Sequence, residues 1–410
     1  MVAANRRPQP AAQDGIPIKG KYLIALKPGR KSVDLESHIG WVEGVHKRGL
    51  SAHQFRGVER TYSGHFQGYA GHFDADTISE IRRNPDVAMV EEDKIWELAL
   101  LQPEAEEERR EEGGDKSMLL HRRTLTTQTN CSWGLGAISH RQQGASDYVY
   151  NGKAGEGTYA YIVDSGIRLS HREFEGRAEF AYTAFEEEKT DTFGHGTHVA
   201  GTIGGRTFGV AKKAKLLSVK VFQGRRSATS VILAGFNWAA NDIIQKRRTR
   251  SAVINMSLGG SYSNLFNLAV ETAAGSGVVA IVAAGNEAVD AADVSPASAP
   301  SAVTVAALSR EYTMADYSNY GRVVDIFGPG SKITSAWIGN DTDTNTISGT
   351  SMATPHVVGI ALSAMSVDGV VELGDLTDWL KESATSGAIE GDLKESPNLL
   401  VNNNIDGSWN

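Results

Sequence analysis

Short runs of consecutive apolar residues, separated by longer stretches with helical spacing, fill the chain from about residue 126 onward. Such runs are typical of strands that are buried on both faces, as in a parallel sheet covered by helices. The predicted strands are residues 159–163, 216–221, 253–254, 278–283, 303–307 and 323–327, and the predicted helices include 230–246 and 264–274. The pattern therefore predicts a three-layer α/β fold with a largely parallel sheet.

Residues 21–98 follow a different pattern. An apolar run at 22–26, helical spacing at 33–50, alternation typical of two strands at 58–73 and a last strand at 87–96 surround a second, shorter helix. Thr77 and Glu80 fit a capping box at the start of that helix, and Pro85 must end it. The order β-α-β-β-α-β predicts a small α+β domain of the ferredoxin-like kind.

The remaining segments divide the chain into four parts. Residues 1–20 are polar and are predicted to be a disordered tail, followed by the small domain at 21–98. Residues 99–125 contain a charge run at 103–114 that is too polar to bury, so they are predicted to be a linker. The basic pair Arg122 and Arg123 makes this linker easy to cut. Residues 126–410 form the large domain.

The composition limits the class of protein. Apolar residues make up 40% of the chain and charged residues 22%, as in a soluble globular protein. A net charge of −8 argues against nucleic acid as the main partner, and no apolar run is long enough to cross a membrane. The single cysteine, Cys131, excludes an intramolecular disulfide, and the first twenty residues contain no recognisable signal peptide.

Three polar residues stand where chemistry is expected in such a sheet, beyond the carboxyl ends of its strands. Asp164 directly follows the first strand, His195 lies between two glycines, and Ser351 begins a helix of small residues. Each alone could be an ordinary turn or helix-cap residue. His195 and His198 are three residues apart with no glutamate between them, so they do not match the zinc motif H-E-x-x-H.

Together the three residues predict nucleophilic catalysis. Serine is a weak nucleophile until a neighbouring imidazole takes its proton, and the imidazole needs a carboxylate to orient it. The chain order Asp164, His195, Ser351 is that of subtilisin, and it differs from the order in α/β-hydrolases. The G-x-S-x-G elbow of those hydrolases is also absent, because Ala353 occupies the position of its second glycine.

The local sequences around these residues resemble the subtilase family. Asp164-Ser-Gly, His195-Gly-Thr-His-Val-Ala-Gly and Gly349-Thr-Ser-Met-Ala-Thr-Pro-His are similar to its three signatures. Ser318-Asn-Tyr-Gly and Asp325-Ile-Phe-Gly-Pro-Gly resemble its proteinase K branch. The resemblance implies a subtilisin-like fold and a serine endopeptidase, with residues 21–98 as an inhibitory propeptide that is removed by a cut between about His121 and Thr126.

The resemblance implies further site residues. Asn286 would form the oxyanion hole together with the N–H group of Ser351. The segments that line the substrate, which would bind as an extended strand, would be Ser257, Leu258 and Gly259 and, opposite them, Ala283, Ala284 and Gly285. A structural calcium ion (Ca2+) would be held by two backbone carbonyls and one carboxylate, those of Pro300, Ala302 and Asp325.

The loop at 223–227 contains two adjacent basic residues, Arg225 and Arg226, at the rim implied for the substrate groove. One hypothesis is that they favour substrates with acidic residues two to four positions before the cut. The alternative is an ordinary solvated loop.

The expected partners are polypeptide substrates and the chain's own propeptide, and we expect a monomer. The resemblance implies an extracellular protein, with a vacuolar or other intracellular location as the alternative because no signal peptide is visible. Two other functions remain open: a non-catalytic protein that uses the same groove to bind peptides, and an esterase or lipase.

Overall fold

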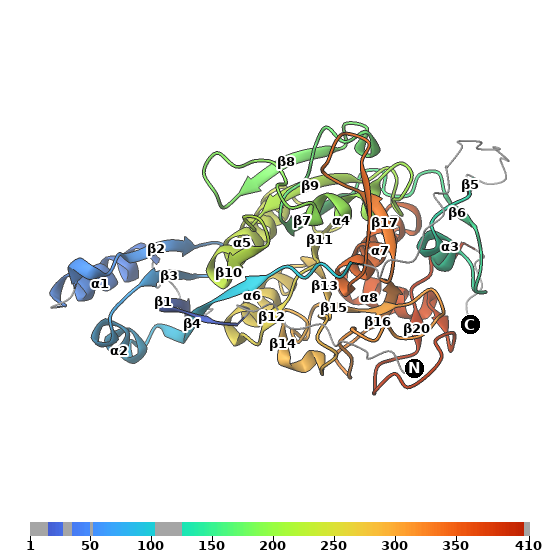
Figure 1. Cartoon of the computed structure of the whole chain (residues 1–410). Coiled ribbons are helices and arrows are strands. Elements are labelled where there is room, and N and C mark those ends of the chain that lie inside the picture. Colours follow the sequence, from blue (N-terminus) through green and yellow to red (C-terminus); the bar gives the residue numbers. More distant parts are fainter. Residues whose placement is uncertain (1–14, 28–34, 50–51, 103–124, 406–410) are drawn as a thin grey trace, which may run out of the picture.

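The computed structural model describes residues 15–27, 35–49, 52–102 and 125–405. Figure 1 shows a small N-terminal unit at one end of the molecule, followed by a larger unit. The charge run at 103–114 and the basic pair Arg122 and Arg123 lie outside the described residues.

The N-terminal unit is an antiparallel sheet with two helices, in the predicted order. Its elements are β1 (Pro17–Leu26), α1 (Leu35–Arg48), the 3₁₀ helix η1 (Ala52–Gln54), β2 (Gly57–Tyr62), β3 (Gly68–His72), α2 (Ala75–Arg83) and β4 (Val87–Glu97). Within the unit the strands lie in the order β4-β1-β3-β2. Ile24, Val42 and Ile81 are buried between the sheet and the helices. Strand β1 begins earlier than the apolar run at 22–26, inside the stretch that was predicted to be a tail.

The start of α2 differs from the prediction. Asp74 is the N-cap residue, and its carboxylate accepts a hydrogen bond of 2.7 Å from the N–H group of Thr77. Thr77 itself is buried inside the first turn, so the capping box predicted for Thr77 and Glu80 is wrong. Asp74 satisfies one of the free N–H groups at the helix start, as Asp does at this position. The helix ends at Arg83, before Pro85, as predicted.

The large unit contains a nine-stranded sheet, in the order β19-β20-β16-β15-β13-β11-β7-β9-β8. Its strands are β7 (Tyr159–Asp164), β8 (Ala178–Thr183), β9 (Lys215–Lys220), β11 (Ala252–Met256), β13 (Val279–Ala283), β15 (Val303–Leu308), β16 (Ile326–Pro329), β19 (Thr385–Ser386) and β20 (Leu399–Leu400). All neighbouring strands are parallel except β19 and β20. The predicted parallel α/β sheet is therefore confirmed.

Helices cover both faces of this sheet, because successive strand residues point to opposite sides. Ile162 packs with α4 (His195–Gly204), α7 (Thr350–Ser363) and α8 (Leu373–Ser383), whereas Tyr161 and Val163 pack with α5 (Thr229–Gln245) and α6 (Asn264–Ala274). These two apolar layers form the main core.

Smaller elements complete the large unit. They are β5 (Leu125–Thr129), α3 (Trp133–Ser139), β6 (Asp147–Asn151), η2 (Arg172–Phe174), β10 (Arg226–Ala228), β12 (Gly260–Ser261), η3 (Ala291–Asp293), β14 (Val294–Ser295), β17 (Ile333–Ala336), β18 (Thr344–Ile347) and the π-helix η4 (Ala364–Asp368). In the described part of the chain, no single helix has the length and apolar character to span a membrane, although the bent pair 350–368 and 373–383 passes on length and composition.

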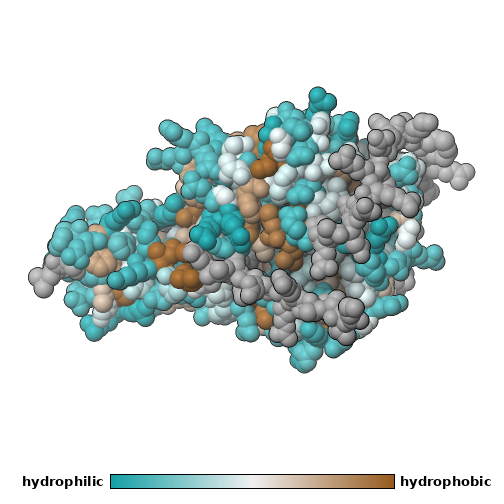
Figure 2. Space-filling view, viewed as in Figure 1, coloured by the Kyte–Doolittle hydropathy of each residue, from teal (hydrophilic) through white to brown (hydrophobic). Residues whose placement is uncertain are grey.

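The N-terminal unit is docked on the large unit through β4. Strand β4 pairs with β10, so that the antiparallel sheet continues from one unit into the other. Beside this pairing, Asp93 accepts hydrogen bonds of 3.0 and 2.6 Å from the N–H and hydroxyl groups of Ser230, at the start of α5. Glu91 accepts bonds from Ser263 and Leu265, at the start of α6. Both carboxylates thus satisfy helix N-termini of the other unit. On the face seen in Figure 2, hydrophobic residues are visible mainly where the two units meet and in the middle of the large unit.

Two histidines are buried among the helices on one face of the large sheet. The ring nitrogen Nε2 of His198 donates to the carbonyl groups of Ile333 and Asn345, at 2.9 and 3.2 Å. Burial lowers the pKa of His198 to about 3 and that of His356 to about 4. Both rings are therefore neutral in the folded protein at neutral pH.

The protein should lose stability in mild acid. A histidine whose folded pKa lies below its unfolded value binds more protons in the unfolded chain, so the stabilisation is present above about pH 6.5 and declines as the pH falls. For His198 alone the free energy of unfolding should fall by about 2 kcal/mol between pH 7 and pH 5.

Urea unfolding at the two pH values measures this change. His198→Gln should flatten the pH dependence even if its stability at pH 7 is lower, whereas His53→Gln, which changes an exposed ring, should not. An unchanged pH dependence in the His198 variant would contradict the assignment.

Candidate active site

The candidate residues lie at the carboxyl edge of the large sheet. Asp164 is the last residue of β7, His195 is the first residue of α4, and Ser351 is the second residue of α7. Asn286 follows β13, a nearby strand of the sheet. The parallel arrangement thus brings residues from distant parts of the chain to one edge, as expected from the strand ends.

Asp164 and His195 form a buried hydrogen-bonded pair. Nδ1 of His195 lies 2.9 Å from each carboxylate oxygen of Asp164, and both side chains are fully buried. Because a carboxylate can only accept, Nδ1 carries the proton and Nε2 is left as the basic nitrogen. Nε2 is buried without a hydrogen-bond partner among the described residues. An imidazole in this state is ready to accept a proton from a group placed beside it.

Ser351 is directed to a different partner. Its Oγ donates a 3.0 Å hydrogen bond to the carbonyl of Ser257, so it makes no bond to Nε2 of His195 in this conformation. Helices α4 and α7, which carry His195 and Ser351, pack against each other. A bond between the two side chains therefore requires the hydroxyl of Ser351 to turn from Ser257 toward the ring.

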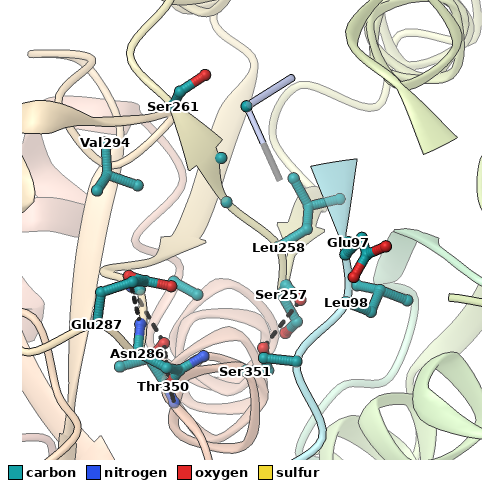
Figure 3. Close-up of a pocket in the computed structure, with 16 residues that line it drawn as sticks. Glu97, Leu98, Ser257, Leu258, Ser261, Asn286, Glu287, Val294, Thr350 and Ser351 are labelled. Carbon is teal, nitrogen blue, oxygen red and sulfur yellow. Dashed lines mark hydrogen bonds between the residues drawn. The ribbon is translucent and has the colours of Figure 1, made fainter. Parts of the chain in front are cut away.

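Asn286 is fixed by its side-chain oxygen. Oδ1 accepts hydrogen bonds from the N–H and hydroxyl groups of Thr350, at 2.8 and 3.1 Å. The preceding Gly285 has φ of +107°, and a Cβ atom there would lie 2.2 Å from the side-chain nitrogen of Asn319. Only glycine fits this turn. With its oxygen held by Thr350, Asn286 has its amide nitrogen available as a donor beside Ser351 (Figure 3).

A pocket of about 160 Å³ adjoins Ser351. Residues 257–261 and Ala283, Gly285 and Asn286 line it. In Figure 3, Ser257 and Leu258 lie on one side of the pocket and Asn286 and Glu287 on the other. Of the predicted substrate-binding residues, Ser257, Leu258, Gly259, Ala283 and Gly285 line this pocket. Ala284 does not: it is fully buried, and its N–H group bonds to the carbonyl of Val305.

The chain's own residues 97–99, the end of β4 and the two residues after it, also line this pocket. In Figure 3 the side chains of Glu97 and Leu98 lie on the Ser257 side, close to Ser351. The end of the N-terminal unit therefore occupies the same groove as the candidate nucleophile.

Sequence reasoning missed Asp191. Its buried carboxylate accepts hydrogen bonds from the N–H groups of Phe193, Gly194 and Thr197 and from the hydroxyls of Thr197 and Ser165. It thereby ties the start of α4 to the loop after Asp164. The only signal in the sequence was a carboxylate four residues before His195, in a segment rich in turn formers.

Lys220 was also missed. It is fully buried, yet its ammonium group donates to the carbonyls of Ser165 and Phe222, at 2.6 and 2.8 Å, and pairs with Glu188 at 3.0 Å. These bonds hold the loop that follows Asp164. A lysine at the end of an apolar strand gave no indication of this role.

The one carboxylate among the residues predicted to hold calcium is already paired with a cation. One carboxylate oxygen of Asp325 pairs with the ammonium group of Lys381 at 2.7 Å, and the other accepts a 2.8 Å bond from the N–H group of Thr304. An ammonium ion thus already neutralises the one charged ligand that joins Pro300 and Ala302 in the prediction. The described residues also contain no group of three or more His, Cys, Asp or Glu side chains that could hold a metal ion.

Comparisons with known proteins agree with this geometry. Residues 155–398 match the subtilase family, and residues 21–99 match the peptidase inhibitor I9 family. The chain is 52% identical over 410 residues to alkaline protease 1 of Aspergillus clavatus, covering 98% of this chain and 95% of that protein. It is 49% identical to an alkaline proteinase of Hapsidospora chrysogena, covering 96% and 94%.

A solved structure gives the same result. The crystal structure of a cold-adapted subtilisin-like serine proteinase is similar with a TM-score of 0.60 and 38% identity, and the match covers 67% of this chain and 99% of that one. The large unit with its candidate site and the N-terminal unit thus both match proteins of one family. The chain belongs to the subtilase family: it is a subtilisin-like serine peptidase that carries an I9-type propeptide domain at its N-terminal end.

Proposed function

We propose that the chain is the inactive precursor of an endopeptidase that cuts proteins with Ser351, His195 and Asp164 as its catalytic triad. The observation that carries the proposal is the His195 ring, which bonds to both oxygens of Asp164 and keeps a buried, unpartnered Nε2 at the start of α4, the helix that packs against α7 with Ser351. This is the arrangement that a general base needs.

The proposed reaction has two stages. His195 takes the proton of the Ser351 hydroxyl while its oxygen attacks the substrate carbonyl, and Asp164 stabilises the resulting imidazolium. The side-chain amide of Asn286 and the N–H group of Ser351 hold the oxyanion. His195 then protonates the departing amine, which leaves an acyl-enzyme on Ser351. Water, deprotonated by His195, hydrolyses this ester and restores the hydroxyl.

The substrate is proposed to bind as an extended strand along residues 257–259. Gly-rich backbone on both walls of the pocket suits β-strand addition, in which backbone hydrogen bonds supply affinity. The short β10 on the rim supports this mode, since it already pairs with β4 in an antiparallel ladder.

Residues 21–98, together with the start of β1 from Pro17, are proposed to act as an intramolecular inhibitor, with 99–125 as the linker that is cut and 126–410 as the peptidase domain. The support is the docked β4, together with the carboxylates of Asp93 and Glu91 at the starts of α5 and α6. The cut between about His121 and Thr126 remains a prediction, because residues 103–124 lie outside the described part. We also propose that the protein acts outside the cell and as a monomer.

Ser351→Ala should give a precursor that stays intact. Without the hydroxyl no acyl-enzyme can form, so the purified variant should keep its N-terminal unit, while the parent chain and the control Ser276→Ala are processed. Intact mass spectrometry over time measures this, and fluorophosphonate labelling should be lost in the same variant. Removal of the N-terminal unit from pure Ser351→Ala protein would refute self-processing.

Asn286→Ala should lower kcat by about 100- to 1,000-fold, the loss found when the corresponding donor is removed from subtilisin, a member of this family. The Michaelis constant should change little, because the donor acts on the oxyanion and not on the bound substrate. Steady-state kinetics with a peptide amide tests this. A change confined to KM would exclude Asn286 from the oxyanion hole.

Members of the subtilisin-like fold family commonly bind calcium. For this chain we propose that the ion competes at Pro300, Ala302 and Asp325 with the ammonium group of Lys381. Lys381→Met should therefore lower the melting temperature in chelator and make it rise when calcium is added, because the Asp325 carboxylate is then without its cation.

The melting temperatures of parent, Lys381→Met and the exposed-site control Lys153→Met, each with chelator and with calcium, decide the point. The parent and the control should respond only weakly to calcium. An equally large calcium response in the parent and in Lys381→Met would show that Lys381 does not compete for this site.

A further inference from the structure

The rim residues Arg225 and Arg226 are in contact with the chain's own N-terminal unit. In the β4–β10 ladder, Arg226 is opposite Glu97, Ser227 is opposite Trp96 and Ala228 is opposite Ile95. The ladder is extended by one bond, from the N–H group of Leu98 to the carbonyl of Arg225 at 2.8 Å. The end of β4 is thus bound as a peptide substrate would be, as an added antiparallel strand.

The path of residues 98–101 past Ser351 determines which peptide bond is aligned with the Ser351 hydroxyl. Leu98 belongs to the apolar layer under α5 and α6, whereas Leu100 packs against the opposite layer, under α4 and α7. Of the described residues that follow β4, Ala99 is the last before residue 103 that lines the pocket with Ser351. Beyond it, the carbonyl of Leu101 accepts a 2.9 Å bond from the N–H group of Ser348. This path aligns Ala99 with Ser351, so that the peptide bond in register with the nucleophile is Ala99–Leu100. The maturation cut proposed between about His121 and Thr126 lies further along the chain and is a separate event.

In this register Glu97 is the third residue before that bond. Its side chain is only 2% exposed, although it is a carboxylate at the rim of a groove. One oxygen pairs with Nη2 of Arg225 at 3.2 Å, and the other bonds to Nε of Arg226. The two guanidinium groups thus hold one carboxylate from both sides, while remaining about half exposed themselves.

No other carboxylate among the described residues pairs with these two arginines. Glu188, the acidic residue nearest in the same rim, bonds to Lys220, Thr192 and Gln223 instead. When the N-terminal unit leaves, two adjacent positive charges lose their counter-charge at the edge of the groove. Such a pair attracts an acidic group that arrives in the same position, with a strength that falls as salt increases.

We propose that Arg225 and Arg226 form a subsite that selects substrates with Asp or Glu at the third position before the scissile bond. This inference rests on the proposed endopeptidase function and adds to it a substrate class, peptides that are acidic at one defined position. Glu97 is the precursor's own occupant of the subsite. The two arginines are specificity-determining residues, since they contact the substrate three residues away from the bond that breaks.

The test compares peptides that span residues 95–102 of the chain and differ only in the residue at the Glu97 position, which is Glu, Gln or Lys. We expect kcat/KM of the matured enzyme to be about 5- to 10-fold higher for Glu than for Gln at low salt, and lowest for Lys, with the preference shrinking as sodium chloride is added. The new N-terminus of the product, read by mass spectrometry, should be Leu100.

Variants locate the effect. Arg225→Gln plus Arg226→Gln should bring the Glu-to-Gln ratio close to 1, and Arg225→Glu plus Arg226→Glu should reverse the preference toward Lys. The control Arg310→Gln, which removes the same charge from an exposed position elsewhere, should keep the parent's ratio.

The outcomes separate the inference from the function on which it rests. Equal kcat/KM for the Glu and Gln peptides in the parent enzyme, or a preference that survives in both double variants, would overturn the subsite while leaving the peptidase intact. A matured protein that cleaves none of the peptides, and no casein either, would overturn the proposed function itself.

Discussion

The hydrogen bonds between His195 and Asp164 lie at the junction of β7 and α4, where neither side chain reaches solvent. Burying a carboxylate beside an imidazole is costly unless every charge has a partner. The surrounding structure supplies those partners in layers: the N–H group of Ser165 bonds to Asp164, and Asp191 ties Ser165 to the start of α4. Lys220 then fixes the loop from the other side. A large part of the fold at this edge thus holds one imidazole in one orientation.

The same edge also receives the N-terminal unit, which docks there through β4 and, in addition, through hydrogen bonds of Tyr62, Ser63 and His65 to α5. The large unit offers two helix starts and one unpaired rim strand close to the groove. Asp93, Glu91 and β4 occupy all three. The docked unit thus supplies partners to donors at two helix starts and along one short strand.

The sequence predicted the fold correctly wherever the local pattern of apolar residues determines the secondary structure. Apolar runs located the strands of the parallel sheet, although β16 begins at Ile326 and not at Val323, because Val324 takes part in a turn that closes on Gly321. The order of elements in residues 21–98 was also predictable. The start of α2 was not, since Asp74 and Thr77 are both good cap residues and only packing decides that Thr77 is buried.

The sequence indicated which residues could form the site, but it did not indicate which contacts those residues make. Family-like motifs predicted Asp164, His195, Ser351 and Asn286 as site residues, and all four lie at the carboxyl edge of the large sheet. Asp191 and Lys220 both bond to Ser165, and Lys381 pairs with Asp325; these partners are far away in the sequence, so no local pattern indicates the bonds. The direction of the Ser351 hydroxyl, toward Ser257, depends on a single side-chain torsion and leaves no trace in the sequence either.

Strand β4 is held to the large unit entirely by bonds that lie upstream of Ala99. A cut anywhere after that residue, including the one proposed between about His121 and Thr126, would leave the ladder to β10, both helix-start carboxylates and the Glu97 ion pairs untouched. Under the proposed function, hydrolysis and activation are therefore separate events, and the cut fragment stays bound through these contacts until it dissociates or is itself digested. Activity in a fresh preparation should consequently appear after a lag and then accelerate, since each liberated molecule can destroy the fragments that silence its neighbours.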